Sequence, residues 1–168
     1  MPVVEDAIEE VVNGEIRIMP PAKLKHALIV AQLHAALAAR LDPAKYVVLT
    51  GSFGLIVRKA PLTSRVPDLA VFDRTELDEQ DGYLHSPPRL LAEVLSPANT
   101  RRHMEEKLVD YACMAVPEVW VISPEARTVE VLRLESGFLR RAQILASGSL
   151  SPQLLPQAAI DIAAIWPD

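Results

Sequence analysis

Glu93 is the residue whose position says most about chemistry. It lies inside the run Leu90-Leu91-Ala92-Glu93-Val94-Leu95, which has the length of a strand and is otherwise apolar, as in a strand buried on both faces. A buried carboxylate without a partner is costly, so Glu93 needs a cation, a hydrogen-bonding network or a proton. We favour a functional site. The alternatives are an ion pair with a nearby arginine, or an edge strand whose glutamate faces water.

Asp68 repeats this pattern. It follows Pro67 and opens an apolar run over residues 69–72. If the two strands are neighbours, the carboxylates of Asp68 and Glu93 converge on one spot, where like charges repel unless a metal ion lies between them. Oxygen ligands favour Mg²⁺ or Mn²⁺ over zinc. Taken alone, Asp68 fits an ordinary Pro-Asp turn equally well.

The helix expected over residues 101–115 supplies a third group, Lys107. At about 100° per residue, Lys107 lies about 60° from Met104 on the helical wheel, at the flank of the buried stripe. His103 and Asp110 share that flank. A lysine there can bury its stem and direct its amine towards the end of the buried strand. A solvated lysine paired with a glutamate is the alternative.

The elements that must position these groups follow from periodicity and turn residues. We expect helices over 4–12, 24–41 and 101–115. Strands are expected over 15–19, 46–50, 55–58, 68–72, 90–95, 119–122, 129–134 and 139–145, the second and third joined around Gly51 and Gly54 and the last two forming a hairpin. This order predicts an α/β or α+β fold with a central mixed sheet flanked by helices.

Composition limits the function classes. The 168 residues, half of them apolar, fit a single domain over 1–168. A net charge of -5 argues against a protein that coats nucleic acid by bulk charge. Cys113 is the only cysteine, which excludes an intramolecular disulfide and a cysteine zinc cluster and favours a reducing cytoplasm. The acidic start is not a secretory signal, and the apolar stretch 27–41 is too short to span a membrane.

Several short motifs together resemble one family. They are Asn13-Gly14-Glu15, Met19-Pro20, His26, Pro67-Asp68, Ala92-Glu93-Val94-Leu95-Ser96-Pro97, Thr100-Arg101-Arg102, Glu106-Lys107, Tyr111 and Val116-Pro117-Glu118-Val119-Trp120-Val121. In this pattern the chain resembles the Uma family of bacterial endonuclease-like proteins, within the PD-(D/E)XK nuclease superfamily. The resemblance covers most of the chain, its block from Glu93 to Trp120 is quite specific, and it implies a restriction-endonuclease-like core.

The resemblance also implies roles for individual residues. Asp68 and Glu93 would hold Mg²⁺ or Mn²⁺, and Lys107 would position or activate the attacking water. The strand position that usually holds this lysine is Leu95 here, so the role passes to the following helix. Glu10 matches an N-terminal glutamate that can complete the acidic site, although a solvated helix carboxylate is an equal alternative. The implied reaction is metal-assisted hydrolysis of phosphodiester bonds in DNA, by a homodimer.

Substrate contacts are expected from four further residues. Arg101 and Arg102, near a helix start, are candidates for phosphate binding, and a solvated face explains them equally well. His26 matches the family but lies on an apolar helix face, where a hydrogen-bonded core histidine is the commoner finding. His103 replaces an acidic residue typical of the relatives, one helical turn before the lysine. Ser123 likewise replaces a common aspartate.

Two other functions stay open at this point. The substituted His103 and the acidic charge favour a catalytically silent module that acts in binding or assembly. A metal-dependent hydrolase of another phosphate ester could use the same scaffold. The acidic pair and the lysine favour the nuclease.

Overall fold

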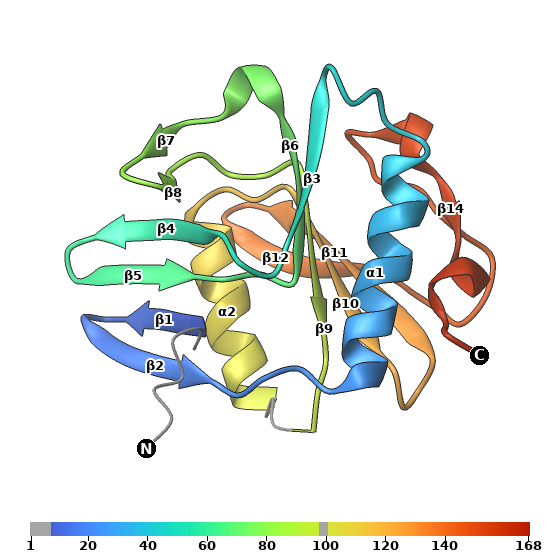
Figure 1. The fold of residues 1–168 in the computed structure, drawn as a ribbon, viewed down its shortest axis with the longest axis horizontal. Coiled ribbons are helices and arrows are strands. Elements are labelled where there is room, and N and C mark those ends of the chain that lie inside the picture. The colour runs from blue at the N-terminus through green and yellow to red at the C-terminus, as the bar shows by residue number, and fades with distance from the viewer. Residues whose placement is uncertain (1–7, 98–100) are drawn as a thin grey trace.

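The computed structural model describes residues 8–97 and 101–168, which form two six-stranded sheets and two α-helices (Figure 1). The central sheet has the strand order β12-β11-β10-β9-β6-β3. Its strands are β3 (Tyr46–Thr50), β6 (Leu69–Asp73), β9 (Leu90–Val94), β10 (Glu118–Ser123), β11 (Thr128–Glu135) and β12 (Phe138–Leu145). Within this sheet β9 and β10 are parallel and the other neighbours are antiparallel, so the sheet is mixed.

The second sheet has the order β2-β1-β5-β4-β8-β7 and lies on the left in Figure 1. Its strands are β1 (Ile8–Val12), β2 (Glu15–Met19), β4 (Gly54–Lys59), β5 (Leu62–Arg65), β7 (Glu79–Gln80) and β8 (Tyr83–Leu84). The remaining elements are the short pair β13 (Ser149–Leu150) and β14 (Ile160–Asp161) and the 3₁₀ turns η1 (Arg74–Glu76), η2 (Pro156–Ala158) and η3 (Ile162–Ile165).

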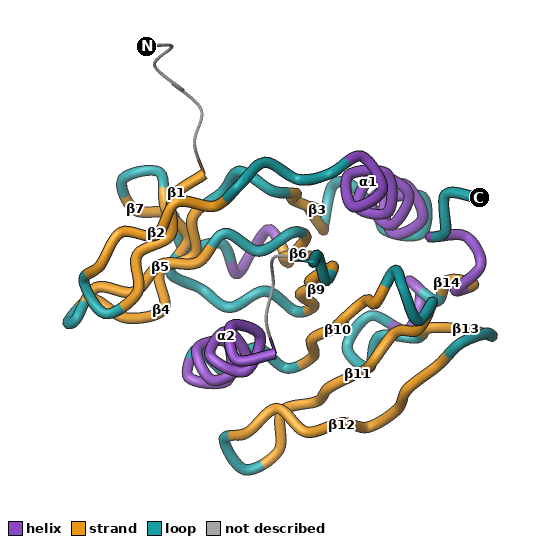
Figure 2. Tube along the Cα trace, turned by 90° about the horizontal axis from the view of Figure 1, so that it is seen from below, coloured by secondary structure: helices purple, strands orange, loops and turns teal. Residues whose placement is uncertain are grey.

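The helices cover opposite faces of the central sheet. In Figure 2, β6, β9 and β10 run between α1 (Leu24–Ala38) and α2 (Arg101–Cys113). Side chains alternate along each strand. Leu90, Ala92 and Val94 of β9 therefore pack in the α1 core, whereas Leu91 packs in the α2 core. The expected α+β class with a mixed sheet flanked by helices is confirmed. Because Glu93 alternates with Ala92 and Val94 along β9, its side chain points towards α2, as that of Leu91 does.

The N-terminal helix expected over residues 4–12 is wrong, because Ile8–Val12 is the strand β1. Residues 4–7 lie outside the described part of the chain. The spacing of Val4, Ile8 and Val11 imitates a helical stripe, but the following Asn13-Gly14 turn decides the structure. Both turn residues have positive φ, 51° and 82°, as a two-residue hairpin turn requires. β1 therefore pairs with β2 as a hairpin.

The link between β3 and β4 connects the two sheets. The two strands are joined around Gly51 and Gly54 as expected, and they belong to different sheets, because β3 pairs with β6 in the central sheet and β4 pairs with β5 in the second. The glycine-containing link is therefore a crossover between sheets. The polar segment 73–89 contributes η1, β7 and β8.

The other expected elements are present, with small shifts at their ends. Helix α1 ends at Ala38 and helix α2 at Cys113, and Thr100, the residue before α2, lies outside the described residues. The hairpin of β11 and β12 forms as expected. None of the helices in the described segments has the length and apolar character needed to cross a bilayer.

Candidate active site

A cleft of about 1010 Å³ opens between the β1–β2 hairpin, α1 and α2. The sequence candidates that line it are Glu10, His26, Asp68, Glu93, His103 and Lys107. The structure therefore brings together groups from five separate segments of the chain. Arg101 and Arg102 are not among the lining residues. The two arginine side chains are 94% and 87% exposed and pair with Glu105 and Glu106.

Glu93 is buried in β9, and each of its oxygens faces a different group on α2. The Tyr111 hydroxyl donates a hydrogen bond to Oε1 at 2.5 Å, and the Lys107 ammonium lies 3.6 Å from Oε2. Burial raises the pKa of Glu93 to about 8, with a further rise from the charge of Asp68, while Lys107 and Tyr111 act in the opposite direction. The protein thus holds a carboxyl group that favours a proton or a cation beside it.

Lys107 is buried with it, its side chain only 5% exposed. Burial lowers the pKa of this ammonium, but the negative charges of Glu93, Glu10 and Asp68 outweigh burial, and the net pKa is raised. The lysine therefore stays charged inside the cleft wall. The aliphatic stem packs into the protein, as expected for a lysine at the flank of a buried stripe.

Asp68 directly precedes β6. Because Leu69 pairs with Ala92, Asp68 and Glu93 come next in the same antiparallel register. The backbone N–H of Val94 donates to Asp68 Oδ2 at 2.7 Å, and His26 Nε2 lies 3.2 Å from the same oxygen. No donor from the described residues bonds Oδ1. The two carboxylates therefore lie on neighbouring strands at one end of the central sheet.

His26 reaches Asp68 from the first turn of α1. This hydrogen bond raises the pKa of His26, although burial acts in the opposite direction. The other ring nitrogen, Nδ1, is buried and has no partner among the described residues. His26 is thus hydrogen-bonded, as a core histidine would be, while its ring also lines the cleft.

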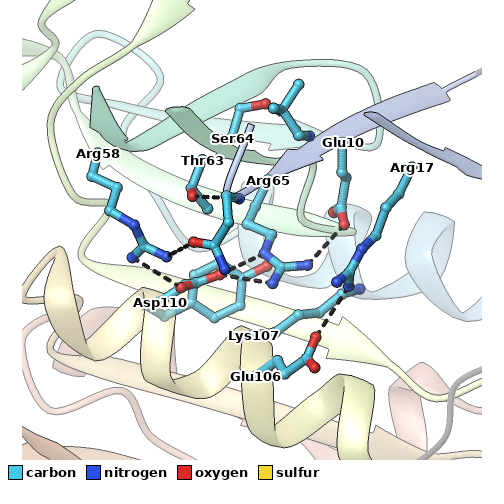
Figure 3. Close-up of polar contacts among 12 residues, drawn as sticks. Glu10, Arg17, Arg58, Thr63, Ser64, Arg65, Glu106, Lys107 and Asp110 are labelled. Atoms are coloured by element: carbon cyan, nitrogen blue, oxygen red, sulfur yellow. Dashed lines mark hydrogen bonds and ion pairs between the residues drawn. The ribbon is translucent and has the colours of Figure 1, made fainter. Parts of the chain in front are cut away.

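Glu10 is neither on a helix nor solvated, because it belongs to β1 and is 1% exposed. The backbone N–H of Val66 donates to its Oε1 at 3.0 Å, and Arg65 Nη1 donates to its Oε2 at 3.1 Å. Figure 3 shows Arg65 between Glu10 and Asp110. Both oxygens of Glu10 are therefore engaged by the protein.

The donor chemistry fits a hard divalent cation. Within residues 8–97 and 101–168, no three His, Cys, Asp or Glu side chains are grouped to hold a metal. Mg²⁺ is commonly bound by one or two carboxylates, with water and phosphate oxygens completing its shell. Asp68 and Glu93 supply two carboxylates in one cleft. Burial and the nearby charge of Asp68 disfavour a negative charge on Glu93 unless a cation or a proton accompanies it.

Sequence reasoning missed two site groups. The Tyr111 hydroxyl was overlooked because its helical position marks it as core, which it is, at 0% exposure. Arg65 carried no signal of its own. The nearest signal in the sequence is the run Thr63-Ser64-Arg65. In the structure these three polar residues are all buried in β5.

Comparison with known proteins identifies the family to which the chain belongs. The chain belongs to the Uma2 family, described as "Putative restriction endonuclease", whose model matches residues 4–163. The family resemblance read from the sequence is therefore confirmed.

A solved structure shares the fold. It is described as "a putative nuclease belonging to DUF820 from Anabaena variabilis ATCC 29413" and has a TM-score of 0.76 to this chain at 18% sequence identity. The alignment covers 98% of this chain and 92% of that one. A search of curated proteins gives no match.

Proposed function

We propose that this protein is a metal-dependent endonuclease that hydrolyses phosphodiester bonds in DNA. The observation that carries the proposal is the buried Glu93, which shares a cleft with Asp68 and contacts both Lys107 and Tyr111. Membership of a family of restriction-endonuclease-like proteins supports the same reaction class.

Asp68 and Glu93 would hold Mg²⁺ or Mn²⁺ in this proposal. When bound, such an ion supplies Lewis acidity, which polarises the scissile phosphate and lowers the pKa of a coordinated water. Val94 and His26 fix the orientation of Asp68 by bonding Oδ2. Tyr111 fixes Glu93 in the same way through Oε1. Such supporting bonds keep ligand carboxylates in place.

The Lys107 ammonium would orient the attacking water or stabilise the charge that develops on the phosphate. It is suited to this role because the surrounding carboxylates keep it protonated although it is buried. DNA would enter along the cleft, where His103 and His26 line the wall. Arg101 and Arg102, exposed at the start of α2, would contact phosphates outside the cleft.

A homodimer belongs to the proposal, since a small nuclease that cuts both strands needs two sites. Light scattering should then give twice the 18.5 kDa mass of the chain.

The test compares plasmid and short DNA cleavage by wild type and by Glu93→Gln, with and without Mg²⁺ or Mn²⁺. Loss of the Glu93 carboxylate as a metal ligand should lower the rate of DNA cleavage by about 10²-fold or more. The matched control is Glu118→Gln, because Glu118 is equally buried but is bonded by Trp120 and Arg133 and does not line the cleft. Nicking by Glu93→Gln at the same metal-dependent rate as Glu118→Gln would rule out the metal site.

A silent binding module is the second candidate, favoured by one observation. Three of the four Lys and Arg side chains that line the cleft, Arg17, Arg65 and Lys107, already pair with carboxylates. Absence of cleavage on every nucleic acid, together with absence of Mg²⁺ or Mn²⁺ binding in calorimetry, would establish this alternative.

A further inference from the structure

A buried arginine in the wall of the cleft joins three elements. Arg65 Nε donates to Asp110 Oδ2 at 2.8 Å, and its Nη2 lies 2.7 Å from the same oxygen. On the other side, Nη1 donates to Glu10 Oε2 at 3.1 Å. Figure 3 shows these three side chains, which we call the cross-brace, linking β5, α2 and β1.

The cross-brace is buried throughout, with side-chain exposures of 3% for Arg65, 1% for Glu10 and 6% for Asp110. Burial alone would lower the pKa of Arg65, but the two carboxylates more than offset this, and the net pKa is raised. A buried ion pair is sensitive to the loss of one partner, which leaves an unpaired charge. Arg65 therefore depends on both carboxylates, and Glu10 has Arg65 as its cation partner, whereas Asp110 also accepts a hydrogen bond from Arg58 Nη1 at 3.3 Å.

One arm of the cross-brace leads to Asp68. Glu10 also accepts the backbone N–H of Val66 through its second oxygen. Only Pro67 separates Val66 from Asp68, and the ring of proline fixes its φ angle. The carboxylate of Glu10 therefore sets where the chain enters β6 and, with it, the position of Asp68.

The other arm leads to Lys107. Asp110 follows Lys107 by three residues on α2, so the two side chains lie on the same face of the helix. Arg65 therefore fixes the helix turn that presents Lys107 to Glu93. A second tie lies next to it, where Arg17 Nη1 of β2 donates to Glu106 Oε2 at 3.0 Å (Figure 3).

We propose that Arg65 is a positioning residue, which holds Asp68 through Glu10 and Lys107 through Asp110 at a fixed separation. Glu10 then serves as the anchor of this cross-brace and not as a metal ligand. The inference rests on the proposed function for the roles of Asp68 and Lys107. The arrangement itself does not depend on the reaction.

The first test compares Arg65→Met with Arg133→Met. Arg133 is the control because it also pairs with a buried carboxylate, Glu118 at 3.0 Å, and does not line the cleft. Arg65→Met should lower kcat for DNA cleavage by about 10²-fold, because a small displacement of Asp68 and Lys107 reduces the rate by about that factor. KM should stay within about threefold of the wild-type value. Arg133→Met should leave both constants unchanged, with a smaller loss of Tm, because the Arg133 side chain is 33% exposed.

Arg65→Lys keeps the charge but presents a point charge in place of the fork that reaches two carboxylates. We expect kcat about 10-fold below wild type, with a Tm closer to wild type than that of Arg65→Met. If Arg65→Met does not fold, Arg65→Lys and Asp110→Asn take its place in the comparison.

A second readout does not need nuclease activity. Acetic anhydride labelling, followed by mass spectrometry, measures how well Lys107 is held in its buried pair, with the exposed Lys23 as the internal reference. Arg65→Met and Asp110→Asn should increase labelling of Lys107 several-fold, and Arg133→Met should not.

Two results separate the two claims. If wild type cleaves nothing, the proposed function fails, and the labelling alone decides on the cross-brace. If the Arg65 variants keep kcat and Lys107 labelling within about twofold of Arg133→Met, Arg65 is a structural residue only and the inference is overturned.

Discussion

At the scale of single residues, Tyr111 and Lys107 divide the two oxygens of Glu93 between them. Tyr111→Phe removes the 2.5 Å hydrogen bond to Oε1 and leaves the volume of the ring in place. Groups that support a metal ligand contribute about 10- to 100-fold to affinity, so Mg²⁺ binding by calorimetry should weaken by about 10-fold or more. Tyr46→Phe is the control, since Tyr46 is buried outside the cleft. Equal Mg²⁺ affinity in the two variants would contradict the prediction.

His26 gives a prediction about pH. Its bond to Asp68 raises the pKa of the imidazole above 6.5, against the effect of burial. A raised histidine pKa contributes stability that is complete below the unfolded pKa and is lost as pH rises through the folded pKa. His26→Gln should therefore destabilise most at about pH 5.5 and less at about pH 8.5. Urea unfolding measures this, with His34→Gln as the control for loss of an imidazole on the same helix. A loss of unfolding free energy in His26→Gln that grows as pH rises would contradict this prediction.

At the scale of elements, the sequence predicts most reliably where several local signals agree. The apolar run of β9 and the stripe of α2 are read correctly because burial on both faces, or on one face of a helix, leaves a distinct pattern. The convergence of Glu93 and Lys107 follows from those two elements, and that of Asp68 from the pairing of β6 with β9. β1 is misread because its few apolar residues fit two periods, and only the adjacent Asn13-Gly14 turn distinguishes them.

The cross-brace could not be predicted in this way. Arg65 meets Glu10 across 55 positions and Asp110 across 45. Local periodicity carries no information on such contacts, because they depend on how two sheets and a helix pack. The hydroxyl of Tyr111 is similar, since the helical pattern places the ring in the core without indicating its partner.

The β1–β2 hairpin gives a prediction at this scale. Gly14 has φ +82° and open space where a Cβ would lie, so Gly14→Ala introduces backbone strain without a clash. Gly137 in the β11–β12 hairpin has φ +83° and the same open space. Each alanine variant should lose about 1–2 kcal/mol in denaturant unfolding. Only Gly14→Ala should also slow DNA cleavage, because β1 carries Glu10. Equal activity in both variants would show that the hairpin does not position the site.

At the scale of the whole molecule, the net charge of -5 does not describe the cleft. Arg17, Lys23, Arg65 and Lys107 line it beside the acidic groups, so positive and negative charges are interleaved where DNA would bind. Three of these four cations already pair with carboxylates, which leaves little excess positive charge for phosphates. The field of the molecule therefore cannot hold DNA by itself.

This balance predicts weak DNA binding that depends on the divalent ion. With the four lining cations and the exposed Arg101 and Arg102, the slope of log K against log salt should be no steeper than about -5. Fluorescence anisotropy with a cleavage-resistant phosphorothioate duplex measures it, and chelation of Mg²⁺ should weaken binding further, because no cation then offsets the charge of Asp68 or bridges it to phosphate. A steeper slope would mean that cations outside the cleft and outside the start of α2 supply further phosphate contacts, and that the substrate covers more of the surface than the cleft.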